Sequence, residues 1–268
     1  MPGVRIIWTR IARRHITVDE MPNMSRVAPC PFPALLPNFA LAQNWINKPY
    51  WHRTAWITSL LPQLKADGRL YLLEDDEQRL YDREPFDISD AVTVTCRDNY
   101  RSPQAICQAI NALSLTERSV ISRNPYRGEV PDFHGYDSGI GVVQQTANVF
   151  EQLLGRGFVI EDIVVLTGLG RARSTLLNAG KIGRFRTKRF SGKFSKNADP
   201  IWTDGDLLVE SVYRFKGQSA PAVVLSEVQF DELSILERRK LFVGLTRGQM
   251  AAELVISPAA EKCLSVLL

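Results

Sequence analysis

Residues 207–256 read LLVESVYRFKGQSAPAVVLSEVQFDELSILERRKLFVGLTRGQMAAELVI, and the order of apolar runs in this stretch decides the fold class. Runs rich in valine, leucine and isoleucine at 207–213, 222–228 and 254–256 predict three buried strands. Residues 233–245 lie between the second and third runs and have helical spacing. Strands that alternate with helices indicate a parallel α/β sheet, whose ligands usually lie at the carboxyl ends of the strands.

The same alternation extends toward both ends of the chain. Further strands are predicted at 70–73, 92–95 and 163–166. Further helices are predicted at 56–64, 102–113 and 142–154, from Ser174 and from Pro258. We therefore expect the end of one domain at 56–85 and a second domain, a mostly parallel α/β sheet flanked by helices, at 86–268.

Residues 1–55 are expected to form an irregular N-terminal segment. Its part 21–55 contains six prolines, three basic residues and no acidic residue. Proline lacks a backbone N–H and fixes φ, so neither a helix nor a central strand can run through this part.

The composition is that of an ordinary globular protein. Hydrophobic residues make up 45% and charged residues 23%, which excludes global disorder, and the net charge of +4 favours anionic partners. The four cysteines show no metal-ligand spacing, so we expect a reduced, cytoplasmic setting and no metal site. No apolar run is long enough to span a bilayer, so no membrane partner is expected.

Residues 181–196 carry seven basic residues, three phenylalanines and no acidic residue. Basic residues interleaved with aromatics suit a phosphate backbone and stacked bases, which makes Arg186, Lys188 and Arg189 candidates for nucleic-acid binding. The alternative is a β-hairpin that packs its phenylalanines inward and leaves its charges in solvent, because the same alternation is typical of strands.

Polar motifs follow several of the predicted strands. Asp75, Gln78 and Tyr81 come just after the run at 70–73, where a carboxylate and an amide could reach a nucleotide phosphate. Arg101 lies in 99–103 (NYRSP) at a strand-to-helix junction, where a guanidinium can pair with phosphate oxygens beside the positive end of a helix dipole. An arginine there could equally pair with a nearby carboxylate.

Two more specific motifs lie within 207–256. In 213–218 (YRFKGQ), Gly217 allows backbone amides to approach a ligand and Gln218 can hydrogen-bond a ribose hydroxyl. In the same motif, Lys216 would face nucleic acid or an opposing domain. The second motif, 239–247 (RKLFVGLTR), covers the end of the predicted helix and closes on Arg247.

In the order of the chain, these four motifs resemble motifs III, IV, V and VI of UvrD/Rep-type superfamily 1 DNA helicases, and the resemblance covers about 56–268. It implies a second RecA-like motor domain in which Gln78 senses the terminal phosphate and Arg101 contacts the γ-phosphate. Arg247 would be the arginine finger that stabilises charge on the transferring phosphoryl group. Asp75, Tyr81, Gly217 and Gln218 would complete the nucleotide contacts.

The chain also departs from the family pattern. Glu74 replaces a glycine, and Arg83 replaces the tryptophan that stacks on single-stranded DNA in the family. The large helical DNA-binding subdomain before motif V is absent, so duplex unwinding is less expected. Residues 167–175 (TGLGRARST) have the outline of a phosphate loop, but the spacing is wrong and arginine stands where lysine is required, which favours a structural turn.

The family's first motor domain supplies a Walker A lysine, yet no GKT or GKS occurs in the 268 residues. Residues 16–20 (ITVDE) resemble a Walker B strand, in which Glu20 would activate water. The following residues, 21–23, do not fit that pattern and favour a surface acid. ATP and Mg²⁺ are therefore expected only together with a polypeptide that carries the Walker A motor domain.

Two functions remain open at this point. The chain can supply one half of an ATP site, with single-stranded DNA as a further partner. Alternatively, it is a non-catalytic nucleic-acid or protein interaction module, or a gene fragment, that retains the fold. In either case the isolated chain is expected to be inactive as an ATPase and helicase.

Overall fold

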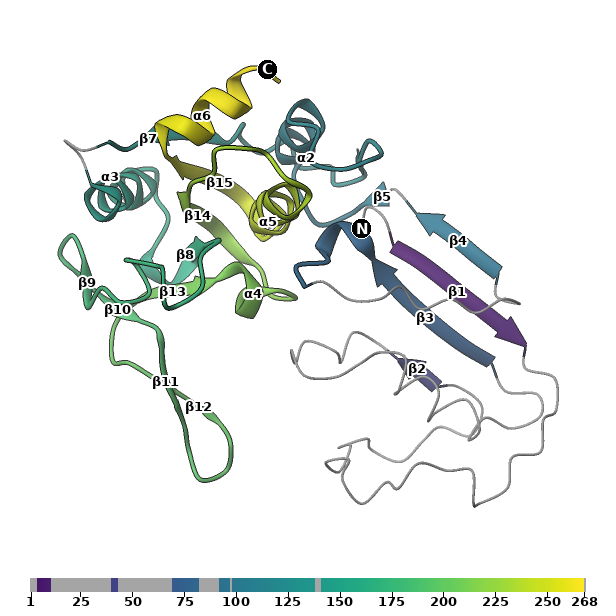
Figure 1. Ribbon diagram of the computed structural model, residues 1–268, viewed down its shortest axis with the longest axis horizontal. Coiled ribbons are helices and arrows are strands. Elements are labelled where there is room, and N and C mark those ends of the chain that lie inside the picture. The colour runs from purple at the N-terminus through teal and green to yellow at the C-terminus, as the bar shows by residue number, and fades with distance from the viewer. Residues whose placement is uncertain are drawn as a thin grey trace. The chain divides into compact units, whose positions relative to one another are not determined.

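The computed structural model describes residues 4–10, 40–42, 69–81, 92–96, 98–137 and 141–267 (Figure 1). Two compact units divide the chain: the larger contains Glu77–Leu80 and Arg97–Leu268, and the smaller contains Gly3–Asp76 and Tyr81–Cys96. The predicted helix at 56–64 and the Walker B-like residues 16–20, with Glu20, lie outside the described residues. Within the described part, no helix combines the length and apolarity needed to cross a membrane.

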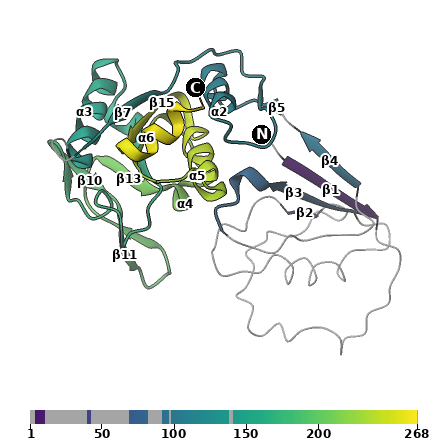
Figure 2. The same cartoon turned by 45° about the horizontal axis from the view of Figure 1, so that its top comes forward.

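The smaller unit contains a four-stranded sheet in the order β2-β3-β1-β4. Its members are β1 (Val4–Arg10), β2 (Ala40–Ala42), β3 (Arg69–Asp75) and β4 (Val92–Cys96). β1 pairs antiparallel with both β3 and β4, which lie on either side of it in Figure 2. β3 and β4 confirm two predicted strands. β1 and β2 were not predicted, although β2 is a short edge strand, as the surrounding prolines require.

The larger unit is built on a seven-stranded sheet in the order β7-β15-β14-β8-β13-β10-β9. All neighbours are parallel except β9 and β10, which confirms the expected mostly parallel sheet. The strands are β7 (Asp132–Gly135), β8 (Ile163–Thr167), β9 (Lys181–Ile182), β10 (Phe185–Lys188), β13 (Leu207–Ser211), β14 (Ala220–Val228) and β15 (Gly248–Ile256).

Helices cover both faces of this sheet (Figure 1). They are α2 (Gln104–Ala112), α3 (Val142–Gly155), α4 (Val212–Phe215), α5 (Ile235–Leu245) and α6 (Pro258–Ser265). Val164 and Leu166 of β8 join the core that includes residues of α2, α5 and α6, whereas Ile163 and Val165 join the core formed with α3. β8 is therefore buried on both faces, as its continuous apolar run indicates.

The helix predicted from Ser174 is absent, and residues 171–179 form turns instead. The carboxylate of Glu227, at the end of β14, accepts hydrogen bonds from the Thr175 amide at 2.6 Å, the Leu176 amide at 3.2 Å and the Ser174 hydroxyl at 2.6 Å. It also accepts one from the Thr167 hydroxyl at 2.6 Å. The prediction was wrong because a distant side chain satisfies amides that a local pattern assigns to a helix.

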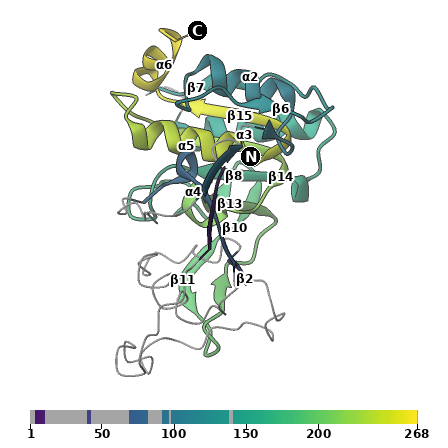
Figure 3. The ribbon, with the colours of Figure 1, turned by 90° about the vertical axis from the view of Figure 1, so that its right-hand side faces the viewer.

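Short strands complete the larger unit. β5 (Asp98–Asn99) pairs with β6 (Ile121–Ser122), and β11 (Phe190–Phe194) pairs with β12 (Pro200–Trp202). The β11–β12 hairpin extends away from the seven-stranded sheet in the two views of Figures 1 and 3. Two short 3₁₀ helices are also present. η4 (Asp76–Gln78) is followed by the buried Leu80, and η5 (Ile160–Asp162) leads directly into β8.

Candidate nucleotide half-site

The turn formed by 213–218 and the end of α5 are in direct contact. The Arg247 guanidinium donates from Nη1 to the Gln218 carbonyl oxygen at 3.2 Å. The Ala220 amide donates to the Arg247 carbonyl oxygen at 3.0 Å, where β14 and β15 begin side by side. The structure therefore brings together two of the predicted site residues, Gln218 and Arg247.

The Arg247 side chain is only 1% exposed. Besides the bond to Gln218, its Nε donates to the Val243 carbonyl at 3.1 Å and its Nη2 to the Thr246 hydroxyl at 3.0 Å. A buried guanidinium is tolerated when oxygens surround it, and the last carbonyls of a helix carry partial negative charge. In this conformation Arg247 fastens the end of α5 to the 213–218 turn.

The 213–218 turn is shaped by one glycine. Gly217 has φ +91°, a left-handed conformation that favours glycine, and the Gln218 amide then donates to the Phe215 carbonyl at 3.0 Å. Gly217 and Gln218 are exposed, whereas Lys216 is half-buried. The turn therefore presents the Gln218 side chain to solvent while its carbonyl is held by Arg247.

Tyr213, the aromatic residue that opens this turn, is half-buried next to α5. Burial raises the pKa of its hydroxyl, and the Glu237 carboxylate raises that pKa further, while Arg173 acts in the opposite direction. The Tyr213 hydroxyl is therefore protonated at neutral pH.

Arg101 is placed by a separate, well-fixed loop. The Asn99 side chain accepts hydrogen bonds from the amides of Arg101 and Ser102, both at 2.9 Å, and Asn124 donates to the Arg101 carbonyl at 2.9 Å. The half-buried Arg101 guanidinium makes no hydrogen bond or ion pair with another described residue. The loop thus fixes the backbone and leaves the guanidinium uncommitted.

The start of α2 differs from the expected phosphate-binding helix end. The Gln104 amide donates to the Tyr126 carbonyl at 3.1 Å, and the Ala105 amide donates to the Arg127 carbonyl at 2.8 Å. Amides that would receive an anion at a free helix end are therefore already satisfied. A phosphate contact at this junction would depend on the Arg101 side chain.

Gln78 lies in a segment that packs on the larger unit. Leu80 is buried in its core, and Arg239 of α5 donates from Nη1 to the Arg79 carbonyl at 3.3 Å. The Glu77 carboxylate accepts from the Glu117 amide at 3.0 Å. Helix α5, which Arg247 follows, therefore also holds Arg79, the residue next to Gln78. Asp75 and Tyr81 belong to the smaller unit.

Arg239, the first residue of the 239–247 motif, was not predicted as a site residue. Its Nε atom is buried without a hydrogen-bond partner, while its Nη1 holds the Arg79 carbonyl. It precedes Arg247 by eight residues, a spacing that recurs on one side of a helix, and this was the available signal. It positions the Gln78 segment rather than the end of α5.

The basic segment 181–196 divides into two parts. In β10, Phe185 and Thr187 are buried while Arg186 and Lys188 are exposed, and the Phe185 ring packs edge-on against Phe150 at 4.8 Å. This part follows the hairpin alternative, with its phenylalanine packed inward and its charges in solvent. Arg189 is half-buried and donates to the Ala179 carbonyl at 3.1 Å.

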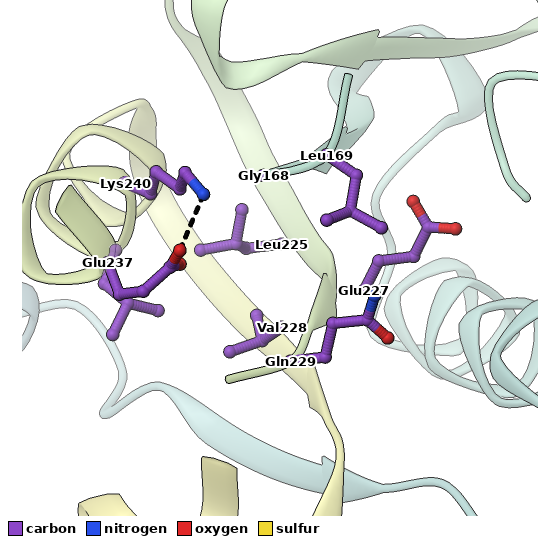
Figure 4. A pocket seen from close by; sticks show the side chains of 9 residues that line it. Gly168, Leu169, Leu225, Glu227, Val228, Gln229, Glu237 and Lys240 are labelled. Atoms are coloured by element: carbon purple, nitrogen blue, oxygen red, sulfur yellow. Dashed lines mark hydrogen bonds and ion pairs between the residues drawn. The ribbon is translucent and has the colours of Figure 1, made fainter. Parts of the chain in front are cut away.

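A small cavity lies at the carboxyl ends of β8 and β14, lined by residues that include Gly168, Leu169, Glu227 and Lys240 (Figure 4). The Lys240 ammonium group pairs with Glu237 at 2.7 Å, and the Glu227 carboxylate turns toward the 174–176 turn. The cavity volume of ≈ 20 Å³ is about that of one water molecule. Residues 168–173 in this region form turns and bends after β8.

Metal-binding chemistry is also limited in this part of the chain. Among the described residues, no group of three or more histidine, cysteine or acidic side chains could hold a metal ion. Cys107 and Cys263 are free thiols, and burial raises the pKa of Cys107.

Residues 206–255 match the sequence profile of the UvrD-like helicase C-terminal domain. Residues 206–255 therefore belong to a UvrD-like helicase C-terminal domain. The matched residues include the 213–218 turn and α5, so the contact between Gln218 and Arg247 lies entirely within the UvrD-like domain. Gln78 and Arg101 lie outside the matched residues.

Two solved structures are similar to parts of the chain. One is the C-terminal domain of a possible DNA helicase from Lactobacillus plantarum WCFS1, at 18% identity and a TM-score of 0.42, covering 63% of this chain and 96% of that one. The other is arterivirus nonstructural protein 10, a helicase, in complex with DNA, at 13% identity and a TM-score of 0.30, covering 52% and 34% respectively. No curated protein sequence matches the chain significantly.

Proposed function

We propose that this chain supplies the second-motor-domain half of an ATP-dependent DNA helicase site. The observation that carries the proposal is the direct contact between Arg247 and Gln218 inside the UvrD-like domain. The phosphates would be held by a Walker A motor domain that lies outside these 268 residues. Gln78, Arg101 and Arg247 would act on the phosphates, and Gln218 with Gly217 would act near the ribose.

The donor set of the half-site fits a nucleotide. Guanidinium groups form strong, often bidentate hydrogen bonds with phosphate oxygens, and an exposed amide side chain suits a ribose hydroxyl. The described residues lack a carboxylate cluster, so the Mg²⁺ ligands would come from the other half of the site. The bound ATP–Mg²⁺ would supply the transferable phosphoryl group, and this chain would supply positive charge and hydrogen bonds.

Arg247 would change partners when the site assembles. Its bonds to the Val243 and Gln218 carbonyls and the Thr246 hydroxyl go to neutral oxygens, whereas phosphate oxygens are charged. Hydrogen bonds between two charged groups are shorter and about twice as strong as neutral ones. A triphosphate that reaches this edge therefore competes with the internal acceptors, and the exposed Gln218 side chain lies beside the same carbonyl.

Single-stranded DNA would contact basic side chains of the larger unit. Arg186 and Lys188 project from the outer side of β10, and Arg186 has only a loose ion pair with Asp204 at 3.4 Å between two exposed side chains. Such a pair exchanges readily for a phosphate. Lys216, in the 213–218 turn, would place a further contact next to the nucleotide half-site.

The test is ATP hydrolysis by the chain alone and after mixing with a purified Walker A motor domain of the UvrD/Rep type that lacks its own second motor domain. We expect no hydrolysis above buffer from either component and ATP turnover from the mixture, increased by single-stranded DNA. Arg247→Ala should abolish the turnover of the mixture. A mixture that stays inactive with the wild-type chain would instead favour the non-catalytic interaction module.

A further inference from the structure

The β11–β12 hairpin has only two short strands, yet it exposes several large apolar side chains to solvent. Phe194 is 59% exposed, Ile201 42% and Trp202 38%, and all three lie on a two-stranded hairpin that stands away from the main sheet (Figure 3). An isolated two-stranded hairpin is marginally stable in water, and clustered exposed aromatics usually mark an interaction site. The phenylalanines of β11 thus do not follow the inward packing seen for Phe185.

Two arginines support the aromatic rings of the hairpin from the body of the domain. The Arg214 guanidinium carbon lies 4.0 Å from the centre of the Phe190 ring and 5.9 Å from that of Trp202. Arg171 lies 5.9 Å from the Phe190 ring and donates to the Ser191 carbonyl at 2.7 Å. The Phe190 and Phe194 rings are 5.2 Å apart. Cation–π contacts at these distances hold the rings in a defined arrangement.

The charge of the hairpin identifies the kind of partner. Residues 188–202 contain four basic residues, Lys188, Arg189, Lys193 and Lys196, and one acidic residue, Asp199. Exposed rings combined with an excess of positive charge fit a polyanion that carries planar groups. In a duplex the bases are already stacked on one another, so only an unpaired strand offers free base faces to aromatic side chains.

We propose that the β11–β12 hairpin is a stacking arm for single-stranded nucleic acid. Phe194 and Trp202 are the stacking residues, Lys193 and Lys196 contact the phosphate backbone, and Arg171 and Arg214 hold the rings. The inference deepens the DNA binding of the proposed function and locates it on a second surface, next to the strand β10 that carries Arg186 and Lys188.

Arg214 joins this arm to the 213–218 turn. It lies on α4, three residues before Gly217, and its Nε donates to the buried Glu210 carboxylate at 2.9 Å. Glu210 is fixed in turn by the Ser211 amide, which donates to it at 2.8 Å. A nucleic-acid strand stacked on the hairpin would therefore contact the region held by Arg214. Arg214 itself belongs to the 213–218 turn, which contacts Arg247.

The test is the binding of a fluorescein-labelled 15-nucleotide oligo(dT) strand to the full chain, measured by anisotropy without ATP, with a duplex of the same length as comparison. The doubly substituted Phe194→Ala/Trp202→Ala chain should bind the single strand about tenfold more weakly, because base–aromatic stacking makes a large contribution at each base. Ile235→Ala, which removes an equally exposed apolar side chain from α5, should bind as the wild type does.

A second measurement does not depend on the fold of the double variant. Stacking of a base on Trp202 should quench tryptophan fluorescence in the wild-type chain, and Trp202→Phe should lose that quenching while keeping the affinity within about threefold, since phenylalanine also stacks. Unchanged affinity of the double variant, equal affinity for duplex, or equal quenching in Trp202→Phe would each overturn the proposal. Because no ATP is present, failure of the nucleotide half-site would leave these results unaffected.

Discussion

Three of the hydrogen bonds of the Arg247 guanidinium go to oxygens of its own domain, and the residue can serve catalysis only if some of these bonds exchange. Val243 lies in the last turn of α5 and Thr246 is its C-cap, so two of the bonds fix the helix end, whereas the bond to Gln218 crosses to another element. The crossing bond is the one that a phosphate would replace with least disturbance of the helix. At the residue scale, Arg247 therefore combines a structural role with the proposed catalytic one.

We expect Arg247→Ala to destabilise the chain by about 2–4 kcal/mol, because it leaves buried carbonyl oxygens without donors and opens a cavity. Urea unfolding followed by circular dichroism measures this free energy. Arg186→Ala removes an exposed arginine with a loose ion pair and should change the free energy of unfolding by less than about 0.5 kcal/mol. Equal stability of the Arg247→Ala and wild-type chains would show that the guanidinium is not bound as described.

At the scale of elements, the sequence predicted those strands and helices whose pattern is complete within the element. β8 reads as a continuous apolar run because both faces are buried, and α5 begins after a serine cap, with the Ser234 hydroxyl accepting from the Glu237 amide. The helix from Ser174 failed because Glu227, some fifty residues away, takes the amides. β1 was missed because its strand state depends on partners as distant in sequence as Asp75 and Cys96, which both pair with Val4.

The site, like the helices and strands, was predicted from the sequence where local motifs suffice. The meeting of the 213–218 turn with Arg247 follows from two local motifs, because parallel strands β14 and β15 bring their first residues together. Two features of the site could not be predicted, because they depend on tertiary contacts that residue spacing does not encode. Arg247 is held by the Gln218 carbonyl, and the first amides of α2 are bonded to the carbonyls of Tyr126 and Arg127.

Glu227→Gln tests the account of the 171–179 turns. The carboxylate accepts bonds from two hydroxyls and two amides, and a glutamine amide group would place a donor against these donors. We expect a loss of about 2 kcal/mol in the free energy of unfolding and faster hydrogen exchange at the amides of Thr175 and Leu176. Glu232→Gln, at an exposed site, is the matched control. Unchanged exchange at both amides would refute the anchoring role.

Gly128→Ala tests how the start of α2 is held. Gly128 has φ +68°, and a Cβ atom there would lie 2.4 Å from Pro103, directly after the carbonyls that receive the first amides of α2. We expect destabilisation by about 1–3 kcal/mol, from strain and displacement of this contact. Gly180→Ala, where a Cβ atom meets nothing within 4 Å, should cost much less. Equal melting temperatures for the two variants would contradict this account.

At the scale of the whole molecule, the larger unit contains the UvrD-like residues 206–255, and the 268 residues contain no GKT or GKS sequence. The sheet, the 213–218 turn and α5 place Gln218 and Arg247 at one edge, and the β11–β12 hairpin places aromatic and basic side chains beside Arg214, which belongs to that turn. This arrangement is what an ATP-driven motor half requires, because nucleotide state and nucleic-acid binding must be coupled through a shared element.

The most direct test of the proposed half-site is the kcat of ATP hydrolysis in the mixture with a Walker A motor domain, compared between wild-type, Arg247→Lys and Arg247→Ala chains of verified fold. The account predicts that Arg247→Ala lowers kcat by about 10³-fold while KM for ATP changes only a few-fold, as for other arginine fingers. Arg247→Lys should recover only a small part of the rate, because lysine cannot form the bidentate contact. A kcat for Arg247→Ala equal to that of the wild type would contradict the account.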